Sequence, residues 1–530
     1  MTSAPATTPA AGAARAAGGA PAQPSTIGTI LTRSAARYPD RIALEFAGRT
    51  WTYTELDAAA TAAAHWLLAL GLRPGDRVAT YGKNSDAYLL AWLGCCRAGL
   101  VHVPVNFNLV GGDLAYILAQ SGSRVALVDP SLAGQLAEGR ATGGDGIEIV
   151  AALRDSDDSF LAAVRPGVGG PSQGALPVVT DTDLAQLLYT SGTTSLPKGA
   201  MMTHRALLHE YLSALTALDA SADQFMLHAL PMYHSAQMHV FLMPWLMIGA
   251  RNLLLEVPAP AAVFDAIENR GCDAFFAAPT VWVLLSNHPD FATRDLSALK
   301  RAYYGASIMP VPILHRLLDR FPGLKVYNCF GQSEIGPLAT VLGPEEHAER
   351  PASCGRPVLF VQARCVDETG VDVAPGVQGE VVYRSPQLLT GYWGNAPATA
   401  EAFRDGWFRS GDLAVRDEQG YFTIVDRIKD VINTGGVLVA SREVEDALYA
   451  HPAVGEVAVI GVPDDTWIEA IAAVVVVKDG SVTPEELIAD ARTRLPGFKT
   501  PKQVKIVPEL PKNASGKLLK RVLRDEFDQL

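Results

Sequence analysis

Long apolar runs and an excess of charge of one sign are both missing from this chain of 530 residues. The apolar stretch that ends in residues 240–250 is far shorter than the roughly 18 residues needed to cross a bilayer, so we expect no transmembrane segment. The 44 Lys and Arg against 56 Asp and Glu give a net charge of −12, which argues against nucleic acid as a partner. Hydrophobic residues make up 48% of the chain, a composition that excludes disorder over most of its length.

Cysteine is also scarce. The six cysteines include no Cys-x-x-Cys pair and no histidine at metal-ligand spacing: Cys95, Cys96, Cys272, Cys329, Cys354 and Cys365. A chain of this length can stabilise its core without disulfides. We therefore expect reduced, mostly buried thiols and a cytoplasmic protein.

The first 25 residues differ in composition from the rest. They hold ten Ala, four Pro and three Gly, and Arg15 is their only charge. They lack the charged segment and unbroken apolar stretch of a secretory signal. We predict a disordered tail over residues 1–25, with ordered chain from about residue 27.

Apolar runs of strand length alternate with segments of helical period in the first half of the chain. Strands are predicted at residues 77–80, 101–105 and 125–128, and helices at 86–97 and 112–120. This alternation is typical of parallel βαβ units and continues to about residue 425. The last hundred residues form a separate small α/β pattern, with strands at 457–462, 471–478 and 504–507 and a helix at 484–494.

Three common catalytic motifs are absent from the sequence. Gly516-Lys517 is followed by Leu518, so there is no Walker A loop, and no predicted strand leads into G-x-G-x-x-G. The run from Gly331 to Ile335 misses the G-x-S-x-G nucleophile elbow by its last glycine. A P-loop NTPase, a dinucleotide-dependent enzyme and a serine hydrolase are therefore not indicated.

One segment rich in hydroxyl groups is suited to bind a polyanion. A strand-like run at residues 184–188 leads into Tyr189-Thr190-Ser191-Gly192-Thr193-Thr194-Ser195-Leu196-Pro197-Lys198-Gly199. Hydroxyls and backbone amides near the glycine can surround phosphate oxygens, and the lysine adds a point charge. A solvated Ser/Thr-rich turn would have the same composition. The spacing of further motifs is therefore needed to distinguish a phosphate-binding loop from such a turn.

The spacing and order of the motifs resemble those of the adenylate-forming superfamily, which includes acyl-CoA synthetases, peptide-synthetase adenylation domains and luciferases. The resemblance runs from about residue 27 to the C-terminus and is closest to fatty-acyl-CoA synthetases. It implies an α/β fold with a large N-terminal domain of mostly parallel βαβ-type sheets (residues 26–425), a hinge (426–430) and a small mobile C-terminal domain (431–530). Ser195 stands where the family usually has glycine, and the rest of the phosphate loop is in register.

The resemblance implies an ATP and Mg²⁺ site. The segment Tyr327-Asn328-Cys329-Phe330-Gly331-Gln332-Ser333-Glu334 is similar to the family's aromatic-Gly-x-Thr-Glu motif. By this likeness Phe330 stacks on adenine, Asn328 bonds its amino edge, and Glu334 binds magnesium together with Thr193. The other implied nucleotide contacts are Thr190, Ser191, Gly192, Thr194, Lys198, Gly305, Ala306, Ser307, Gly331, Gln332, Ser333, Asp412 and Arg427. Of these, Asp412 and Arg427 would hold the ribose.

The C-terminal lysine and the hinge complete the implied machinery. Lys517, in the loop 510–517, resembles the family's lysine that reaches the adenylating site, so Lys517, Glu334, Lys198 and Thr193 are the implied catalytic set. Lys429 occupies the pivot position of the hinge. Gly435 and Gly436 resemble the loop that faces the arm of the thiol.

The implied reaction joins a carboxylic acid to a thiol in two steps, through acyl-AMP with release of pyrophosphate. The acyl pocket would be lined by His234, Met238, Tyr304, Gly305 and Gly331. Its surroundings offer apolar side chains and no Lys or Arg, which favours a medium- or long-chain fatty acid, with an aryl acid second. CoA is the expected acceptor. Val437 and Leu438 stand where many members have Glu-Asn, and Ser441 replaces a common Pro, so an acyl carrier protein with its phosphopantetheine is the alternative.

Overall fold

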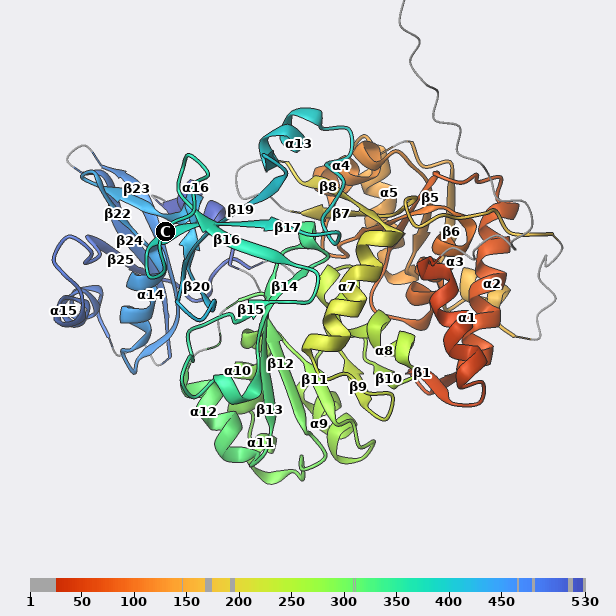
Figure 1. Cartoon of the computed structure of the whole chain (residues 1–530), viewed down its shortest axis with the longest axis horizontal. Coiled ribbons are helices and arrows are strands. Elements are labelled where there is room, and N and C mark those ends of the chain that lie inside the picture. Colours follow the sequence, from red (N-terminus) through yellow and green to blue (C-terminus); the bar gives the residue numbers. More distant parts are fainter. Residues whose placement is uncertain are drawn as a thin grey trace, which may run out of the picture.

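The computed structural model describes residues 25–144, 146–166, 174–190, 196–307, 309, 311–464, 467–478, 482–512 and 518–527. The strands of these residues form four sheets, of nine, six, five and five strands (Figure 1). The predicted tail, apart from Ser25, lies outside the described residues. No helix in the described ranges is long and apolar enough to cross a membrane.

The six-stranded sheet has the order β6-β5-β3-β4-β7-β8 and is parallel except for the pair β7–β8. The predicted strands and helices between residues 77 and 128 are confirmed to within two residues at each end. Its strands are β3 (Arg77–Tyr81), β4 (Val101–Val105), β5 (Ser123–Val128), β6 (Ile149–Ala152), β7 (Leu184–Thr190) and β8 (Lys198–Thr203). Its helices are α3 (Asp86–Ala98), α4 (Gly111–Ser121), η1 (Pro130–Leu132), α5 (Ala133–Ala141) and α6 (Phe160–Val164).

Helix α3 illustrates why these segments fold locally as they do. Ser85 caps its N-terminus by accepting a hydrogen bond from the backbone N–H of Tyr88 (3.1 Å). Gly99 ends it in the left-handed conformation at φ 70°, which glycine adopts without a steric penalty. Every residue of α3 is buried, as expected of a helix with apolar residues on all sides.

The nine-stranded sheet has the order β15-β14-β13-β12-β11-β9-β10-β1-β2, and its neighbours from β1 to β13 are parallel. Its strands are β1 (Ile42–Phe46), β2 (Arg49–Thr52), β9 (Phe225–His228), β10 (Arg251–Leu254), β11 (Ala274–Phe276), β12 (Arg301–Gly305), β13 (Lys325–Gly331), β14 (Leu338–Leu342) and β15 (Arg356–Pro357). The helices of this region are α1 (Ile27–Arg37), α2 (Tyr53–Ala69), α7 (His204–Ala217), η2 (Ala236–Leu242), α8 (Met243–Ile248), α9 (Pro260–Glu268), α10 (Pro279–Asn287), α11 (Asp290–Thr293), α12 (Val311–Arg320), η3 (Ser333–Ile335) and η4 (Pro344–Glu346). Ligands of such sheets bind where the parallel strands end.

The expected alternation of strands and helices stops well before residue 425. From β16 onward the chain forms an antiparallel sheet, with α13 (Ala396–Ala402) as its one helix. The reason is the short turns Asp367–Gly370 and Asp417–Gly420, which can join antiparallel strands but are too short for a parallel crossover. The strands are β16 (Gln362–Val366), β17 (Gln378–Arg384), β18 (Phe403–Arg404), β19 (Trp407–Arg416) and β20 (Phe422–Arg427).

The last sheet belongs to the C-terminal part of the chain, at the left of Figure 1. Its strands are β21 (Ile432–Thr434), β22 (Val437–Val439), β23 (Val454–Asp464), β24 (Ile468–Val477) and β25 (Gln503–Ile506). Its helices are α14 (Ser441–Tyr449), α15 (Pro484–Arg494), as predicted, and α16 (Lys520–Glu526). The short helix η5 (Ile428–Asp430) separates it from β20, while the predicted domain limits stay predictions.

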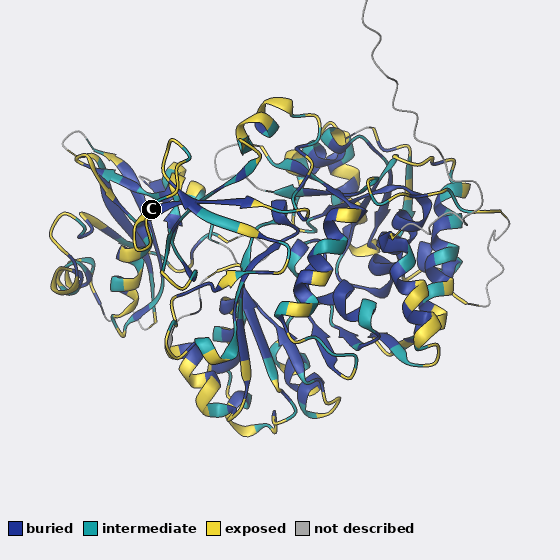
Figure 2. Ribbon diagram, in the orientation of Figure 1, coloured by how far each residue is buried: buried dark blue, intermediate teal, exposed yellow. Residues whose placement is uncertain are grey.

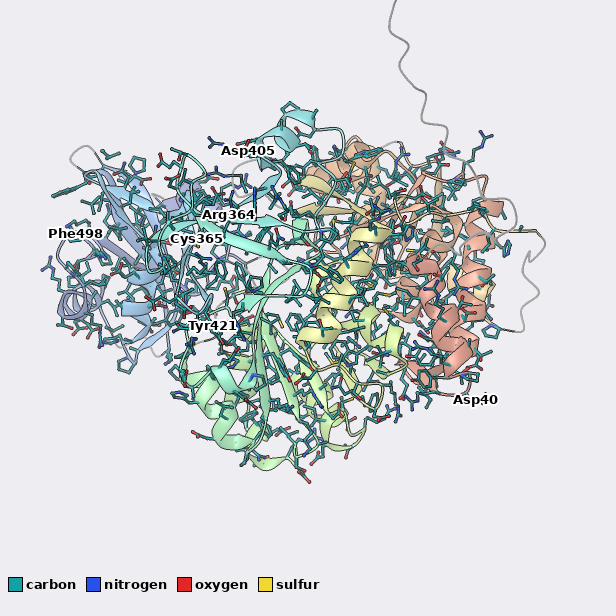
Figure 3. All side chains as sticks on the ribbon, in the orientation of Figure 1. Asp40, Arg364, Cys365, Asp405, Tyr421 and Phe498 are labelled. Atoms are coloured by element: carbon teal, nitrogen blue, oxygen red, sulfur yellow. The ribbon has the colours of Figure 1, made fainter. Side chains whose placement is uncertain are left out.

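The inner strands of the large sheets are mostly buried, and α3 is buried along its whole length (Figure 2). All six cysteines are buried free thiols, as expected, and Cys365 lies on β16 (Figure 3). Burial raises the pKa of Cys365 to about 11 and that of Cys354 to about 12. These thiols are therefore protonated at neutral pH and behave as small core residues.

A hydrogen-bonded chain of polar groups crosses this core. Gln186 on β7 donates through Nε2 to His102 Nδ1 (3.0 Å) and accepts at Oε1 from His239 Nε2 (2.8 Å). Tyr211 donates to His239 Nδ1 (2.9 Å), and His102 Nε2 donates to Thr80 (3.1 Å). Each histidine is thus held as a neutral tautomer, which joins β7 to helix η2.

We predict that the free energy of unfolding falls as the pH is lowered from 7 to 5. Burial lowers the pKa of His102 and His239 to about 3 and of His204 and His228 to about 4, whereas an unfolded histidine titrates near 6.5. The unfolded chain then binds protons that the native protein does not, so stability is lost below pH 6.5, by about 1.4 kcal/mol per pH unit for each such histidine.

Urea unfolding followed by tryptophan fluorescence at pH 7, 6 and 5 measures this loss. His239→Gln should reduce the pH dependence by one proton. His315→Gln, at an exposed position of α12, should leave it unchanged. A midpoint that is constant between pH 7 and 5 would contradict the interpretation.

Candidate active site

A single carboxyl group connects the two large sheets. Glu334 lies in η3, directly after β13, and only 9% of it is exposed. Its Oε1 accepts hydrogen bonds from Thr190 Oγ1 (3.0 Å) at the end of β7 and from Tyr392 (3.2 Å), which follows β17. Three segments that are far apart in the sequence therefore meet at this carboxyl.

Lys198 lies next to both donors of the Glu334 carboxyl. It is the cross-strand partner of Thr190 in the pair β7–β8, and its Nζ stands 5.3 Å from the centre of the Tyr392 ring. The segment around Tyr392 extends β8, since Met201 N–H donates to Gly391 (2.9 Å) and Trp393 N–H donates to Gly199 (2.8 Å). The structure thus places Lys198 beside Thr190 and Tyr392, which both donate hydrogen bonds to Glu334.

Five of the predicted residues lie outside the described part of the chain. They are Ser191, Gly192, Thr193 and Thr194 of the phosphate loop, and Lys517 of the C-terminal loop. Thr190 and Lys198, which flank the phosphate loop, are paired across β7 and β8. Of these two flanking residues, Thr190 hydrogen-bonds Glu334.

The predicted adenine residues lie on two adjacent parallel strands. Tyr304 and Gly305 on β12 are in register with Asn328 and Cys329 on β13. A Cβ at Gly305 would come within 2.1 Å of the Cys329 carbonyl oxygen, so only glycine fits. Ala306 follows at φ 65°, a left-handed conformation that is uncommon for alanine and that often marks functional sites.

Further along β13 the chain also needs a small residue. A Cβ at Gly331 would lie 1.9 Å from the carbonyl oxygen of Pro337, because the two segments cross closely. Phe330 and Gln332 flank this glycine and are partly exposed. Ser307, just beyond the end of β12, is exposed. Asn328 donates through Nδ2 to the carbonyl of Ser353 (3.0 Å), which orients its side chain.

Asp412 and Arg427 form a second group, on the antiparallel sheet. The two residues are cross-strand partners in the pair β19–β20, and Arg427 Nε lies 2.6 Å from Asp412 Oδ1. The Asp412 side chain is only 3% exposed, whereas that of Arg427 is 32% exposed. The predicted ribose residues are thus already paired with each other.

The predicted acyl segment is a π-helix, η2, which is rare in proteins and frequent at functional sites. It carries the buried Met238, and Ser235 just before it hydrogen-bonds Ser333 (2.8 Å) beside Glu334. His234 stacks obliquely on Tyr233, with ring centres 4.5 Å apart. Tyr304 donates to His347 Nε2 (3.2 Å), whose other nitrogen is bonded to the Gly343 carbonyl.

The predicted hinge and thiol residues lie in the C-terminal part of the chain. Lys429 is exposed in η5. Gly435 and Gly436 form the two-residue turn between β21 and β22, with φ of 63° and 87°. Two positive φ values are what a tight hairpin of this kind requires.

Tyr392 is the site residue that sequence analysis missed. It donates to Glu334 and its ring lies under Lys198, and burial together with the neighbouring carboxyl raises its pKa well above the ordinary value. The only sequence signal was an aromatic residue beside Gly391 in a segment without a recognised motif. Its role depends on a pairing with β8 across almost 200 residues.

The residues present fit a magnesium ion that is held mainly by a nucleotide. Mg²⁺ in such sites takes one or two carboxylates and completes its octahedron with phosphate oxygens and water. Glu334 supplies one carboxyl at the phosphate loop, and the described residues contain no cluster of three or more His, Cys, Asp or Glu that would hold a metal alone.

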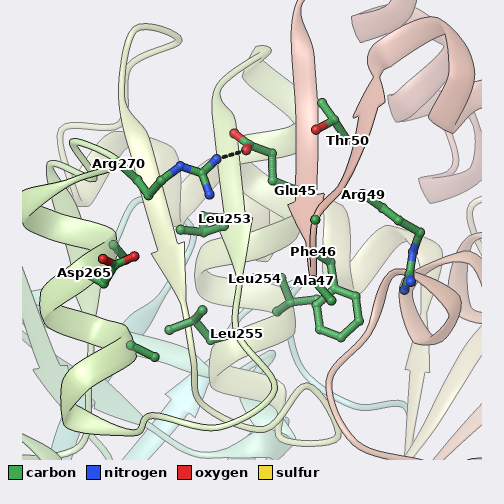
Figure 4. A pocket seen from close by; sticks show the side chains of 13 residues that line it. Glu45, Phe46, Ala47, Arg49, Thr50, Leu253, Leu254, Leu255, Asp265 and Arg270 are labelled. Carbon is green, nitrogen blue, oxygen red and sulfur yellow. Dashed lines mark hydrogen bonds and ion pairs between the residues drawn. The ribbon is translucent and has the colours of Figure 1, made fainter.

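A cavity of about 300 Å³ elsewhere in the large domain is not part of this site. It lies between the β1–β2 turn and α9, where Arg270 pairs with Glu45 (Figure 4). None of the predicted site residues lines it.

Comparison with known families agrees with the geometry. The profile of AMP-binding enzymes matches residues 31–393, and that of the AMP-binding enzyme C-terminal domain matches residues 443–517. The chain belongs to the AMP-binding enzyme family. The predictions of the adenylate-forming family, of its α/β fold and of an acid–thiol ligase are confirmed.

Individual relatives cover nearly the whole chain. A feruloyl-CoA synthase of Amycolatopsis sp is 39% identical over 502 residues, which cover 94% of this chain and 99% of the relative. The fatty acid–[acyl-carrier-protein] ligase ScoC of Streptomyces coeruleorubidus is 33% identical over 497 residues, or 91% and 92% of the two chains. The crystal structure of ATP-bound MatB from Rhodopseudomonas palustris superimposes with a TM-score of 0.86 at 29% identity, over 94% and 99% of the two chains.

We predict that Tyr392→Phe weakens ATP binding in the presence of Mg²⁺ by about fivefold. The change keeps the ring under Lys198 and removes one hydrogen bond to Glu334, worth about 1 kcal/mol. Isothermal titration calorimetry with ATP and Mg²⁺ measures this change in affinity. Tyr421→Phe is the matched control, because Tyr421 donates in the same way to Glu346, another carboxyl. Equal losses in both variants would contradict a specific role of Tyr392.

Proposed function

We propose that this enzyme activates a carboxylic acid with ATP and transfers the acyl group to the thiol of CoA. The observation that carries the proposal is the pair of hydrogen bonds that Thr190 and Tyr392 donate to the Glu334 carboxyl, with Lys198 over the Tyr392 ring. Family membership supports the ATP-dependent chemistry, and the feruloyl-CoA synthase relatives support the acceptor.

In the first half-reaction an oxygen of the substrate carboxylate attacks the α-phosphorus of ATP, the bond to the β-phosphate oxygen breaks, and pyrophosphate leaves. Negative charge on the phosphoryl oxygens has to be met by groups already in place. Lys198 and Lys517 supply positive charge, and Ser191, Gly192 and Thr194 supply donors. Glu334 and Thr193 would hold the magnesium ion, which when bound neutralises phosphate charge.

The nucleotide is positioned by the two strand ends and the antiparallel sheet. Phe330 stacks on adenine, Asn328 accepts a hydrogen bond from its amino group, and Gly305 lets the ring approach the backbone. Ala306, Ser307, Gly331, Gln332 and Ser333 line the remaining edge. Asp412 accepts hydrogen bonds from the ribose hydroxyls, with Arg427 beside it.

In the second half-reaction the thiol attacks the carbonyl carbon of the mixed anhydride, loses its proton, and AMP leaves with the bonding electrons. The small domain turns about Lys429, which withdraws Lys517 and brings Gly435 and Gly436 to the arm of the thiol. The absence of a side chain at both glycines leaves room for that arm.

Two classes of acid are candidates. The relatives named feruloyl-CoA synthase share 39% of their residues with this chain and favour an aryl acid. The fatty-acid ligase ScoC, at 33%, and the apolar η2 segment with Met238 favour the fatty acid expected from sequence. We place the aryl acid first because that relative is the more similar over almost its full length. His234, Tyr304, Gly305 and Gly331 would line the pocket in either case.

The acceptor has one alternative. ScoC is named as a ligase that acts on an acyl carrier protein, so phosphopantetheine on such a protein is the second candidate. Val437 and Leu438 are exposed beside the Gly435–Gly436 turn, where either form of the thiol's arm would pass.

We predict a clear preference in a panel of acids that runs from acetate to palmitate and from benzoate to ferulate. On an apolar wall each buried methylene contributes about 0.8 kcal/mol, or roughly fourfold in kcat/KM, until the pocket ends. An aryl pocket should instead prefer the ring acids by at least tenfold over hexanoate. Pyrophosphate release measures adenylation, and thioester formation with CoA or a carrier protein measures transfer. The absence of acid-dependent pyrophosphate release across the panel would contradict the proposed function.

We predict that Lys517→Ala and Lys429→Pro damage opposite half-reactions. Loss of one preorganised contact at the phosphoryl group typically costs about 10²- to 10³-fold, so Lys517→Ala should lose adenylation yet transfer a supplied acyl-adenylate at a near wild-type rate. Proline fixes φ and stiffens the pivot, so Lys429→Pro should form adenylate but stall in transfer.

Single-turnover assays of each half-reaction, with circular dichroism to check folding, test this pair of variants. The account of a turning small domain is wrong if each substitution slows both half-reactions equally.

A further inference from the structure

A buried carboxyl that is not a predicted site residue lies directly beneath the turn that follows Glu334. Glu210, on α7, is fully buried, and its Oε2 accepts hydrogen bonds from the backbone N–H of Leu338 (3.1 Å) and from Gln387 Nε2 (2.7 Å). Its Oε1 has no hydrogen-bond partner among the described residues.

Gln387, in the segment between β17 and α13, contacts the same turn next to Glu210. It is fully buried, and its Nε2 also lies 3.2 Å from the Ile335 carbonyl and 3.1 Å from the Leu338 carbonyl. Ser213 of α7 donates to its Oε1 (2.7 Å), which fixes the orientation of the amide.

These contacts hold the backbone from Glu334 to Leu338. A Cβ at Gly336 would lie 3.1 Å from both Cβ and Oε2 of Glu210, so the turn rests directly on that side chain. Leu389, two residues after Gln387, donates its N–H to the Glu334 carbonyl (2.8 Å). The turn therefore has little freedom to move the Glu334 carboxyl away from Thr190 and Tyr392.

If this position served packing alone, a buried carboxyl would be unfavourable, because its removal from water costs free energy. No Lys, Arg or His of the described residues pairs with Glu210, and the titratable groups near it are Tyr211 and Cys329, both buried. Burial raises the pKa of Glu210 well above its usual value, because removal from water disfavours the charged form. A leucine would fill a similar volume without the cost of removing a carboxyl from water.

We propose that Glu210 and Gln387 are positioning residues for Glu334: they hold the backbone of residues 335–338 so that the Glu334 carboxyl faces the metal and the phosphates of ATP. The inference rests on the proposed function of Glu334 as the magnesium carboxylate. It assigns to α7 and to the loop after β17 a role in nucleotide binding.

The test measures ATP binding by isothermal titration over a range of Mg²⁺ concentrations. Glu210→Leu and Gln387→Leu should each raise the Mg²⁺ concentration needed for half-maximal binding by about tenfold. Glu210→Gln keeps an acceptor for Leu338 N–H and for Gln387, so it should stay within about threefold of the wild type. Asn252→Leu, which removes another fully buried hydrogen-bonded side chain on β10, should leave the Mg²⁺ midpoint unchanged.

A second measurement asks whether Glu210 acts through Glu334. In the Glu334→Gln background, Glu210→Leu should cause no further change beyond about twofold. The same tenfold shift in both backgrounds would overturn the proposal, as would a shift of equal size in Asn252→Leu. Circular dichroism and thermal unfolding check each variant. Should Glu210→Leu fail to fold, Ser213→Ala, which frees the Gln387 amide, replaces it, and an unchanged Mg²⁺ midpoint in Ser213→Ala and Gln387→Leu would likewise overturn the proposal.

Failure of the proposed function can be told apart from failure of this inference. If Glu334→Gln itself leaves the Mg²⁺ dependence of ATP binding unchanged, the assignment of Glu334 is wrong. If Glu334→Gln weakens it and the Glu210 and Gln387 variants do not, only the positioning role is wrong.

Discussion

The arrangement of this enzyme depends on one buried carboxyl that connects the two large sheets. Glu334 follows the last parallel strand of the nine-stranded sheet, Thr190 ends β7 of the six-stranded sheet, and Tyr392 lies in the segment that pairs with β8 of that same sheet. The hydrogen bonds at Glu334 therefore connect the ends of β7 and β13. The residues predicted to hold adenine lie on β12 and β13, the latter leading directly to Glu334.

The part of the site that could be predicted from sequence is the part that is continuous along the chain. Thr190 and Lys198 flank one loop, and Asn328, Phe330 and Glu334 lie within one strand and the turn after it, so their spacing alone places each set together. Tyr392, Glu210 and Gln387 could not be found in this way, since each reaches Glu334 through pairings between distant segments. The antiparallel sheet was not predicted either. Its strand pairing depends on short turns, whereas the prediction followed the βαβ-like alternation of apolar segments.

The departure from the family pattern at Ser441, near the predicted hinge, is accompanied by hydrogen bonds that a proline could not form. Ser441, which replaces a common proline, donates both its N–H (2.6 Å) and its Oγ (2.8 Å) to Asp426 at the end of β20. A proline could supply neither donor. Lys520 on α16 donates to the same hydroxyl (2.6 Å), so the helix that follows the Lys517 loop is connected to the hinge.

The central claim is that this constellation activates an acid by adenylation before any thiol takes part. Exchange of labelled pyrophosphate into ATP, measured without CoA or carrier protein, tests it most directly, because only a reversible acyl-adenylate can return the label to ATP. The account predicts exchange that requires both Mg²⁺ and the acid that is later converted to thioester. Exchange that does not depend on the acid, or thioester formation from an acid that supports no exchange, would contradict it.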